Sequence, residues 1–275
     1  MMGRILAAAR QPWRKTMRAG WRSTCGMGLL LAAAWLGGWG CASRGARIAD
    51  QQKKGPLHFV RLAQLFYEQG KVNAALEQLD RSLALDDTLP RTWLFRGQIY
   101  SEEERCEDAV ADFRRALEIN PHFTEARMYL ADCLERLGQP DRALEVLGVA
   151  LRDGRFPYPE KIHFNRAMIF LRSGRLDDAL AALRLAVEAQ PRYYLAHFEM
   201  AKILEELGRS AEALEAYRTA APGFAKDPGF LVARAGALLR AGRGAEAGPM
   251  LRRVLILSPG SPAAEKASRL LELID

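Results

Sequence analysis

Small and large apolar residues recur along the chain with the spacing of paired α-helices. Residues 90–123 give the clearest unit, in which positions 4, 8, 11, 20, 24, 27 and 32 are Trp93, Gly97, Tyr100, Ala109, Phe113, Ala116 and Pro121. The same 34-residue frame fits units that begin at Pro56, Pro90, Thr124, Glu160, Tyr194 and Pro228, with one step of 36 residues. Apolar residues at intervals of three and four share one face of a helix, so each unit predicts two amphipathic helices.

Two positions of the frame are occupied by small residues, as the close packing of two helices requires. Position 20 is alanine in all six units, and position 8 is alanine except at Gly97. Glycine, which adopts positive φ without strain, stands at the turn between the helices in five units, whereas the second unit has Glu104. The frame therefore predicts six helix–turn–helix repeats.

This pattern resembles the tetratricopeptide repeat (TPR), whose signature residues 90–123 match at each position. The resemblance implies an all-α fold, a right-handed TPR superhelix of six helix-turn-helix repeats. Residues 260–275 are predicted to form a C-terminal capping helix, because the last repeat otherwise exposes its apolar stacking face. The predicted repeats span 56–259, divided into 56–89, 90–123, 124–159, 160–193, 194–227 and 228–259.

Residues 1–40 are predicted to be a signal peptide, because a basic stretch precedes an apolar run of fewer than 15 residues. Cys41 follows Gly40, as in the bacterial lipobox, although Gly38 and Trp39 depart from the usual residues. We expect lipid attachment at Cys41, a tether over 41–55, and a location on the periplasmic face of the outer membrane of a Gram-negative bacterium. The alternative is a conventional signal peptide and a soluble periplasmic protein.

The net charge of +7 and the pI of 9.4 suggest a nucleic-acid partner at first sight. Residues 1–40 hold six of the 40 lysines and arginines and no acidic residue, which leaves 34 basic against 33 acidic residues elsewhere. No basic excess remains in the repeats to neutralise phosphates. The sequence therefore predicts no nucleic-acid partner.

The repeats carry no motif of a known catalytic or cofactor site. His163 and His197 both stand at position 4, where Trp93 also stands, so packing explains them better than metal binding. Cys106 and Cys133 are expected to be separate thiols, with a disulfide as the open alternative. We therefore expect a protein that is not an enzyme and has no cofactor, metal or catalytic residue.

A protein partner is expected in a groove lined by the first helices of the repeats. Position 5 is apolar in every unit, and two residues of the fourth unit extend the stripe. The predicted groove residues are Val60, Leu94, Met128, Phe164, Met168, Leu171, Phe198 and Val232. Such a groove suits an amphipathic helix or an apolar strand. The alternative is that these side chains are partly buried between repeats and bind nothing. The mixed charges at position 13 are predicted to form a solvated rim.

The whole of residues 41–275 resembles the type IV pilus assembly lipoproteins, the pilotins of the outer-membrane secretin. The insertion at 154–160 contains a Tyr-Pro pair and is followed by Asn165, as in that family. The resemblance implies a lipid-anchored scaffold that helps to assemble or localise the pilus secretin, with a secretin subunit as its partner. A generic periplasmic TPR adaptor for another cell-envelope complex is the alternative.

Overall fold

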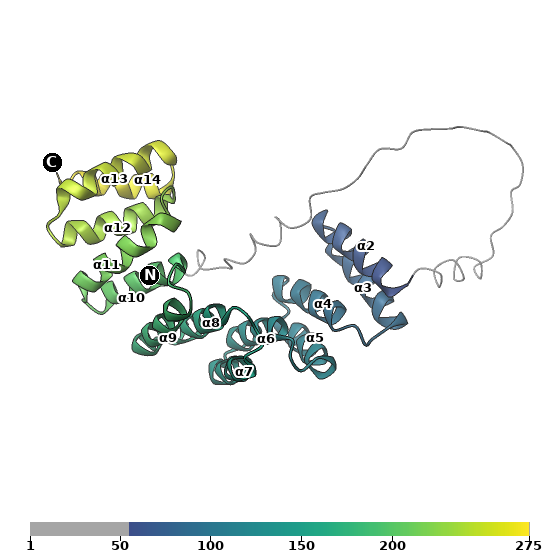
Figure 1. Cartoon of the computed structure of the whole chain (residues 1–275). Helices are drawn as coiled ribbons and strands as arrows, with labels where there is room; N and C mark the ends of the chain where they lie inside the picture. The colour runs from purple at the N-terminus through teal and green to yellow at the C-terminus, as the bar shows by residue number, and fades with distance from the viewer. Residues whose placement is uncertain (1–54, 275) are drawn as a thin grey trace, which may run out of the picture. The chain divides into compact units, whose positions relative to one another are not determined.

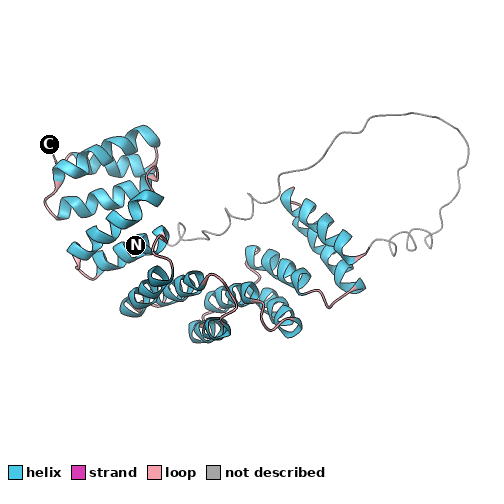
Figure 2. Cartoon of the chain, viewed as in Figure 1, coloured by secondary structure: helices cyan, strands magenta, loops and turns pink. Residues whose placement is uncertain are grey.

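The computed structural model describes residues 55–274, and these residues form helices and turns without strands (Figure 2). Residues 1–54, including Cys41, lie outside the described part, so the signal peptide and the lipid attachment stay predictions. The described part contains one 3-10 helix, Ala221–Gly223, and thirteen α-helices: α2 (Pro56–Glu68), α3 (Val72–Leu85), α4 (Pro90–Glu102), α5 (Cys106–Ile119), α6 (Thr124–Arg136), α7 (Pro140–Asp153), α8 (Pro159–Arg172), α9 (Leu176–Ala189), α10 (Tyr194–Glu206), α11 (Ser210–Ala220), α12 (Pro228–Arg240), α13 (Gly244–Leu257) and α14 (Pro262–Leu271).

The helices pack as six consecutive antiparallel pairs, from α2 with α3 to α12 with α13 (Figure 1). Each pair also contacts the next pair along the chain, and α14 packs against α12 and α13. Ala264 and Ala267 of α14 are buried in that contact, so this helix caps the last repeat. The structure confirms the predicted all-α TPR fold. No helix within residues 55–274 is long and apolar enough to span a bilayer.

The turns inside the repeats follow the glycine pattern of the sequence. Five of these glycines have φ between +71° and +74°. Glu104 stands at the corresponding position of the second repeat, with φ of +63°. It is the one non-glycine residue with positive φ in the part that the structure describes. For a residue with a Cβ atom, this left-handed backbone conformation is less favourable by about 1–2 kcal/mol. The second turn is therefore the strained one.

The alanines at position 20 are completely buried, which lets the two helices of each pair approach closely. In the second repeat, which also has a buried alanine at position 20, Gly97 of α4 packs against Phe113 of α5. A Cβ atom built on Gly97 would lie 2.6 Å from Cε1 of Phe113, so the ring occupies the space that a side chain would need. Helix α8 contributes Ile162 and Ile169 to the apolar core on one side, and Phe164 to the core on the other. The 36-residue step therefore does not interrupt the packing.

Candidate functional site: a ladder between repeats and its apolar window

The first helices of neighbouring repeats are joined by polar contacts at a fixed register. In each contact position 12 of one repeat meets position 13 of the next. The structure pairs Tyr67 with Glu102, Ser101 with Arg136, Glu135 with Arg172, and Glu205 with Arg240. Arg136 donates to the Ser101 carbonyl at 2.8 Å, and the Arg172 Nε lies 2.8 Å from Glu135. We call these four contacts the inter-repeat ladder.

The position 13 charges are exposed, as a solvated rim would be, but four of the six take part in the ladder. Burial raises the pKa of Glu135, and the neighbouring Arg172 opposes that rise. The Tyr217 hydroxyl donates to Glu205 at 2.9 Å, so this carboxylate holds a tyrosine of its own repeat as well as Arg240 of the next. The ladder therefore fixes the relative positions of adjacent first helices.

The ladder is interrupted between the fourth and fifth repeats. Position 12 is Leu171 on α8 and position 13 is Glu206 on α10, and a leucine side chain cannot bond to a carboxylate. Among residues 55–274, the side chain of Glu206 forms no hydrogen bond or ion pair. Met168 lies one helical turn before Leu171. Lys202 of α10 pairs with Glu199 of its own helix. We call Met168, Leu171 and Glu206 the apolar window.

Three of the eight predicted groove residues are buried, so the eight do not form one continuous exposed stripe. Leu94, Phe164 and Val232 are only 8%, 5% and 4% exposed and belong to the core. The reason is that position 5 lies against the segment that ends its own repeat. The Phe164 ring lies 5.3 Å from Tyr193, and that of Phe198 lies 5.2 Å from Phe224.

The other predicted groove residues keep part of their surface exposed. They are Val60, Met128, Met168, Leu171 and Phe198. Phe198 also lies 5.1 Å from Phe230 in an aromatic cluster, so its exposed edge is small. Met168 and Leu171 are partly exposed and lie at the gap in the ladder.

The histidines of position 4 contact their own surroundings. His197 Nε2 lies 3.0 Å from the Pro191 carbonyl, and burial lowers the pKa of His163. Within residues 55–274 no three side chains of His, Cys, Asp or Glu gather at metal-binding distance.

The insertion before α8 contains Tyr158, which is 49% exposed. The Lys161 ammonium lies 4.4 Å from the centre of the Tyr158 ring.

Cys106 and Cys133 are both free, buried thiols, and Cys133 donates to the Ser101 hydroxyl at 3.3 Å. Burial raises the pKa of Cys133 to about 12, although the bond to Ser101 lowers it, and burial also raises the pKa of Cys106. Both groups are therefore protonated at neutral pH.

We expect both thiols to resist alkylation at pH 8 in the folded chain. A thiol with a pKa of about 12 is a thiolate in roughly one molecule in ten thousand at that pH, and the thiolate is the reacting form. The measurement is intact mass after iodoacetamide treatment of a Cys25→Ser/Cys41→Ser chain. Two additions should appear in urea without reductant and none in buffer. No addition in urea would instead reveal a disulfide, and rapid addition in buffer would contradict the burial.

Three family profiles match the chain, and each is described as a tetratricopeptide repeat. They cover residues 100–160, 164–229 and 228–253. The TPR repeat-containing protein YpiA of Bacillus subtilis is 23% identical over 201 residues, which are 72% of this chain and 46% of that protein. Human tetratricopeptide repeat protein 16 is 26% identical over 153 residues, 51% of this chain and 17% of that protein. The chain thus spans less than half the length of these relatives.

Solved structures share the fold over nearly their full length. PilW, described as a widely conserved type IV pilus biogenesis factor, superposes with a TM-score of 0.67 at 21% identity, covering 78% of this chain and 98% of that one. Pseudomonas aeruginosa pilF gives 0.65 at 16% identity, covering 79% and 98%. YrrB, described as a TPR protein with an unusual peptide-binding site, gives 0.51 at 17% identity, covering 70% and 97%. At these identities the likeness establishes the fold.

Proposed function

Because the chain is a tetratricopeptide-repeat protein, we propose that it is a non-catalytic scaffold that binds a protein partner at the apolar window. The interrupted ladder is the observation that carries this proposal. Four junctions are closed by polar contacts, whereas the junction of the fourth and fifth repeats offers Met168 and Leu171 beside the Glu206 carboxylate, which is unpaired in the described part of the chain. A partner segment with an apolar side chain next to a lysine or arginine fits this surface, and methionine adapts to different shapes.

The partner in this proposal is a subunit of the outer-membrane secretin of the type IV pilus, whose assembly or localisation the chain assists. Support comes from the shared fold with PilW over 98% of its length and from the Tyr-Pro insertion before α8. The alternative is a periplasmic TPR adaptor for another cell-envelope complex. The fold shared with the peptide-binding YrrB agrees with either partner.

The same proposal includes the location of the scaffold. Residues 1–40 direct export, and Cys41 carries the lipid that holds the chain to the periplasmic face of the outer membrane. Two or more acyl chains on one residue are enough for stable anchoring, because each buried CH₂ group contributes about 0.8 kcal/mol. Without lipidation the scaffold is soluble in the periplasm.

Leu171→Glu should abolish the function of the scaffold without unfolding it, because Leu171 is partly exposed and the new carboxylate faces Glu206. We expect capture of the partner to fall at least tenfold, which corresponds to about 1.4 kcal/mol. The measurement is the amount of secretin multimers in outer-membrane fractions of a deletion strain that expresses each variant. Phe164→Glu is unsuitable, since Phe164 is a core residue.

Leu185→Glu is the matched control, because Leu185 is 44% exposed and lies on α9, whereas the window residues lie on α8 and α10. It should restore multimers as the natural chain does. Equal amounts of secretin multimers with Leu171→Glu and Leu185→Glu would reject the window as the binding surface. Unchanged secretin multimers and pili in the deletion strain itself would reject the pilus role and leave the adaptor alternative.

A further inference from the structure

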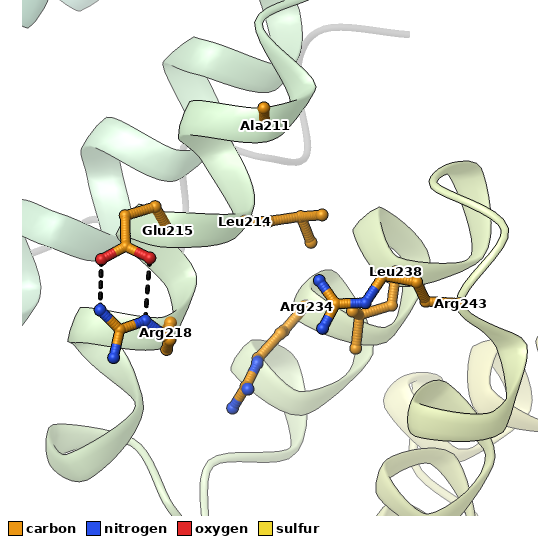
Figure 3. Close-up of a pocket in the computed structure, with 7 residues that line it drawn as sticks. All are labelled: Ala211, Leu214, Glu215, Arg218, Arg234, Leu238 and Arg243. Atoms are coloured by element: carbon orange, nitrogen blue, oxygen red, sulfur yellow. Dashed lines mark hydrogen bonds and ion pairs between the residues drawn. The ribbon is translucent and has the colours of Figure 1, made fainter.

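A pocket of about 270 Å³ lies between the fifth and sixth repeats, apart from the apolar window (Figure 3). Ala211 and Leu214 of α11 and Leu238 of α12 form its apolar part. Its remaining lining is charged and consists of Glu215, Arg218, Arg234 and Arg243. The pocket therefore combines three guanidinium groups with one carboxylate.

Two of the three arginines are already paired. Arg218 Nε lies 2.8 Å from Glu215, and Arg243 Nε lies 2.6 Å from Glu246. Within residues 55–274, the guanidinium group of Arg234 has no hydrogen bond or ion pair. Burial lowers the pKa of Arg234, with Glu246 opposing and Arg243 reinforcing the shift. Arginine nevertheless stays protonated, so the pocket holds a half-buried charge that lacks a direct partner.

At the junction of the first and second repeats, side chains at the same positions of the 34-residue frame fill the space that corresponds to the pocket. Arg96 stands where Arg234 does, and it is clamped by Asp80 at 2.6 Å and Asp112 at 2.7 Å. Tyr100 stands where Leu238 does. The guanidinium carbon of Arg96 lies 5.8 Å from the centre of the Tyr100 ring, and that of Arg105 lies 4.3 Å from it.

The junction of the third and fourth repeats is filled in a related way. Phe170 takes the ring position, with Arg175 at 4.5 Å and Arg166 at 6.0 Å from the ring centre. At the fifth junction the ring is replaced by Leu238, and the two aspartate positions hold Arg218 and Met250. The pocket therefore lacks the aromatic ring that both equivalent sites contain, and it lacks the two carboxylates that clamp Arg96 at the first junction.

We propose that this pocket binds an acidic aromatic segment of a protein partner, with the ring against Arg234 and Arg243 and the carboxylate on Arg234. Guanidinium groups stack on aromatic faces and bind carboxylates through paired N–H groups, so one site can bind both a ring and a carboxylate. The apolar floor of Leu214 and Leu238 supports the ring. This is a second contact surface of the proposed scaffold, built from α11, α12 and Arg243 of the turn after α12, and none of its lining residues belongs to the window on α8 and α10.

The probe for this site is 4-hydroxyphenylacetate, which carries the ring and the carboxylate alone. We expect saturation-transfer NMR with the purified full chain to detect its binding, and Arg234→Met to weaken it by about 10- to 100-fold, the usual cost of losing a hydrogen bond to a charged group. Leu238→Tyr should abolish binding, because the new ring fills the pocket as Tyr100 fills its own site.

Arg166→Met is the matched control, since the equivalent site of the fourth repeat is filled by Phe170. It should leave probe binding unchanged, as should Leu171→Glu, which separates this proposal from the function of the window. Equal binding of 4-hydroxyphenylacetamide or of inorganic phosphate would overturn the proposal, because either would show that the pocket does not require both features. Undiminished binding to Arg234→Met, with unchanged circular dichroism, would also overturn it.

Discussion

Phe113→Ala is expected to lower the free energy of unfolding by about 3–5 kcal/mol, the range for removing a buried aromatic side chain. Phe113 is completely buried and fills the space above Gly97. Its ring also stacks on Tyr129 of the third repeat, with ring centres 5.6 Å apart. The substitution therefore weakens both the second repeat and its contact with the third, and a repeat array depends on such neighbour contacts.

The measurement is urea unfolding followed by circular dichroism, with Ile256→Ala as the control. Ile256 is 80% exposed, so its truncation should change the free energy of unfolding by less than about 0.5 kcal/mol. A loss below 1 kcal/mol for Phe113→Ala would contradict the packing described for the second repeat.

The chain offers a sharper version of this experiment. Gly97→Ala alone should cost about 1–3 kcal/mol, because its Cβ atom collides with the Phe113 ring. Gly97→Ala/Phe113→Leu recreates the alanine–leucine pair found at the same positions in four other repeats, for example Ala63 with Leu79. The double variant should therefore be less destabilised than the sum of the single substitutions. Simple additivity would show that the two positions do not share one space.

Asp112→Ala is expected to destabilise the chain by about 3 kcal/mol, at the lower end for breaking a buried ion pair, because Asp80 still contacts Arg96. Asp112 is 4% exposed, and both of its carboxylate oxygens accept from Arg96, at 2.7 and 2.8 Å. Burial opposes the charge of Arg96, yet the bonds to Asp112 and Asp80 raise its pKa. Removing Asp112 leaves that charge without its main partner.

The control replaces both members of the pair. Arg96→Leu/Asp112→Val reproduces Leu130 and Val146, which occupy these positions in the third repeat. Apolar replacement of a whole buried pair is often neutral, so the double variant should be more stable than Asp112→Ala. Urea unfolding of the three chains measures the difference. A double variant as unstable as Asp112→Ala would mean that packing of the acidic side chain, and not its charge, stabilises the junction.

The helices and their pairing could be predicted from particular residues. The alanines of position 20 let the second helix of each repeat pack closely on the first, and the glycines allow the left-handed turn that joins the two helices. The groove was predicted less well. Position 5 is apolar in every unit, but apolar character does not distinguish Phe164, which is buried, from Met168, which is partly exposed.

The six repeats, their all-helical fold and the place of the capping helix were predictable from the residue pattern, because they depend on contacts at fixed short separations. How neighbouring repeats meet became known from the three-dimensional packing. The ladder joins residues such as Ser101 and Arg136, 35 positions apart, and its gap at Leu171 has meaning only once that register is known. The pocket beside Arg234 likewise depends on whether Leu238 or a tyrosine fills a shared space, since side-chain volume at a junction matters only when the junction has formed.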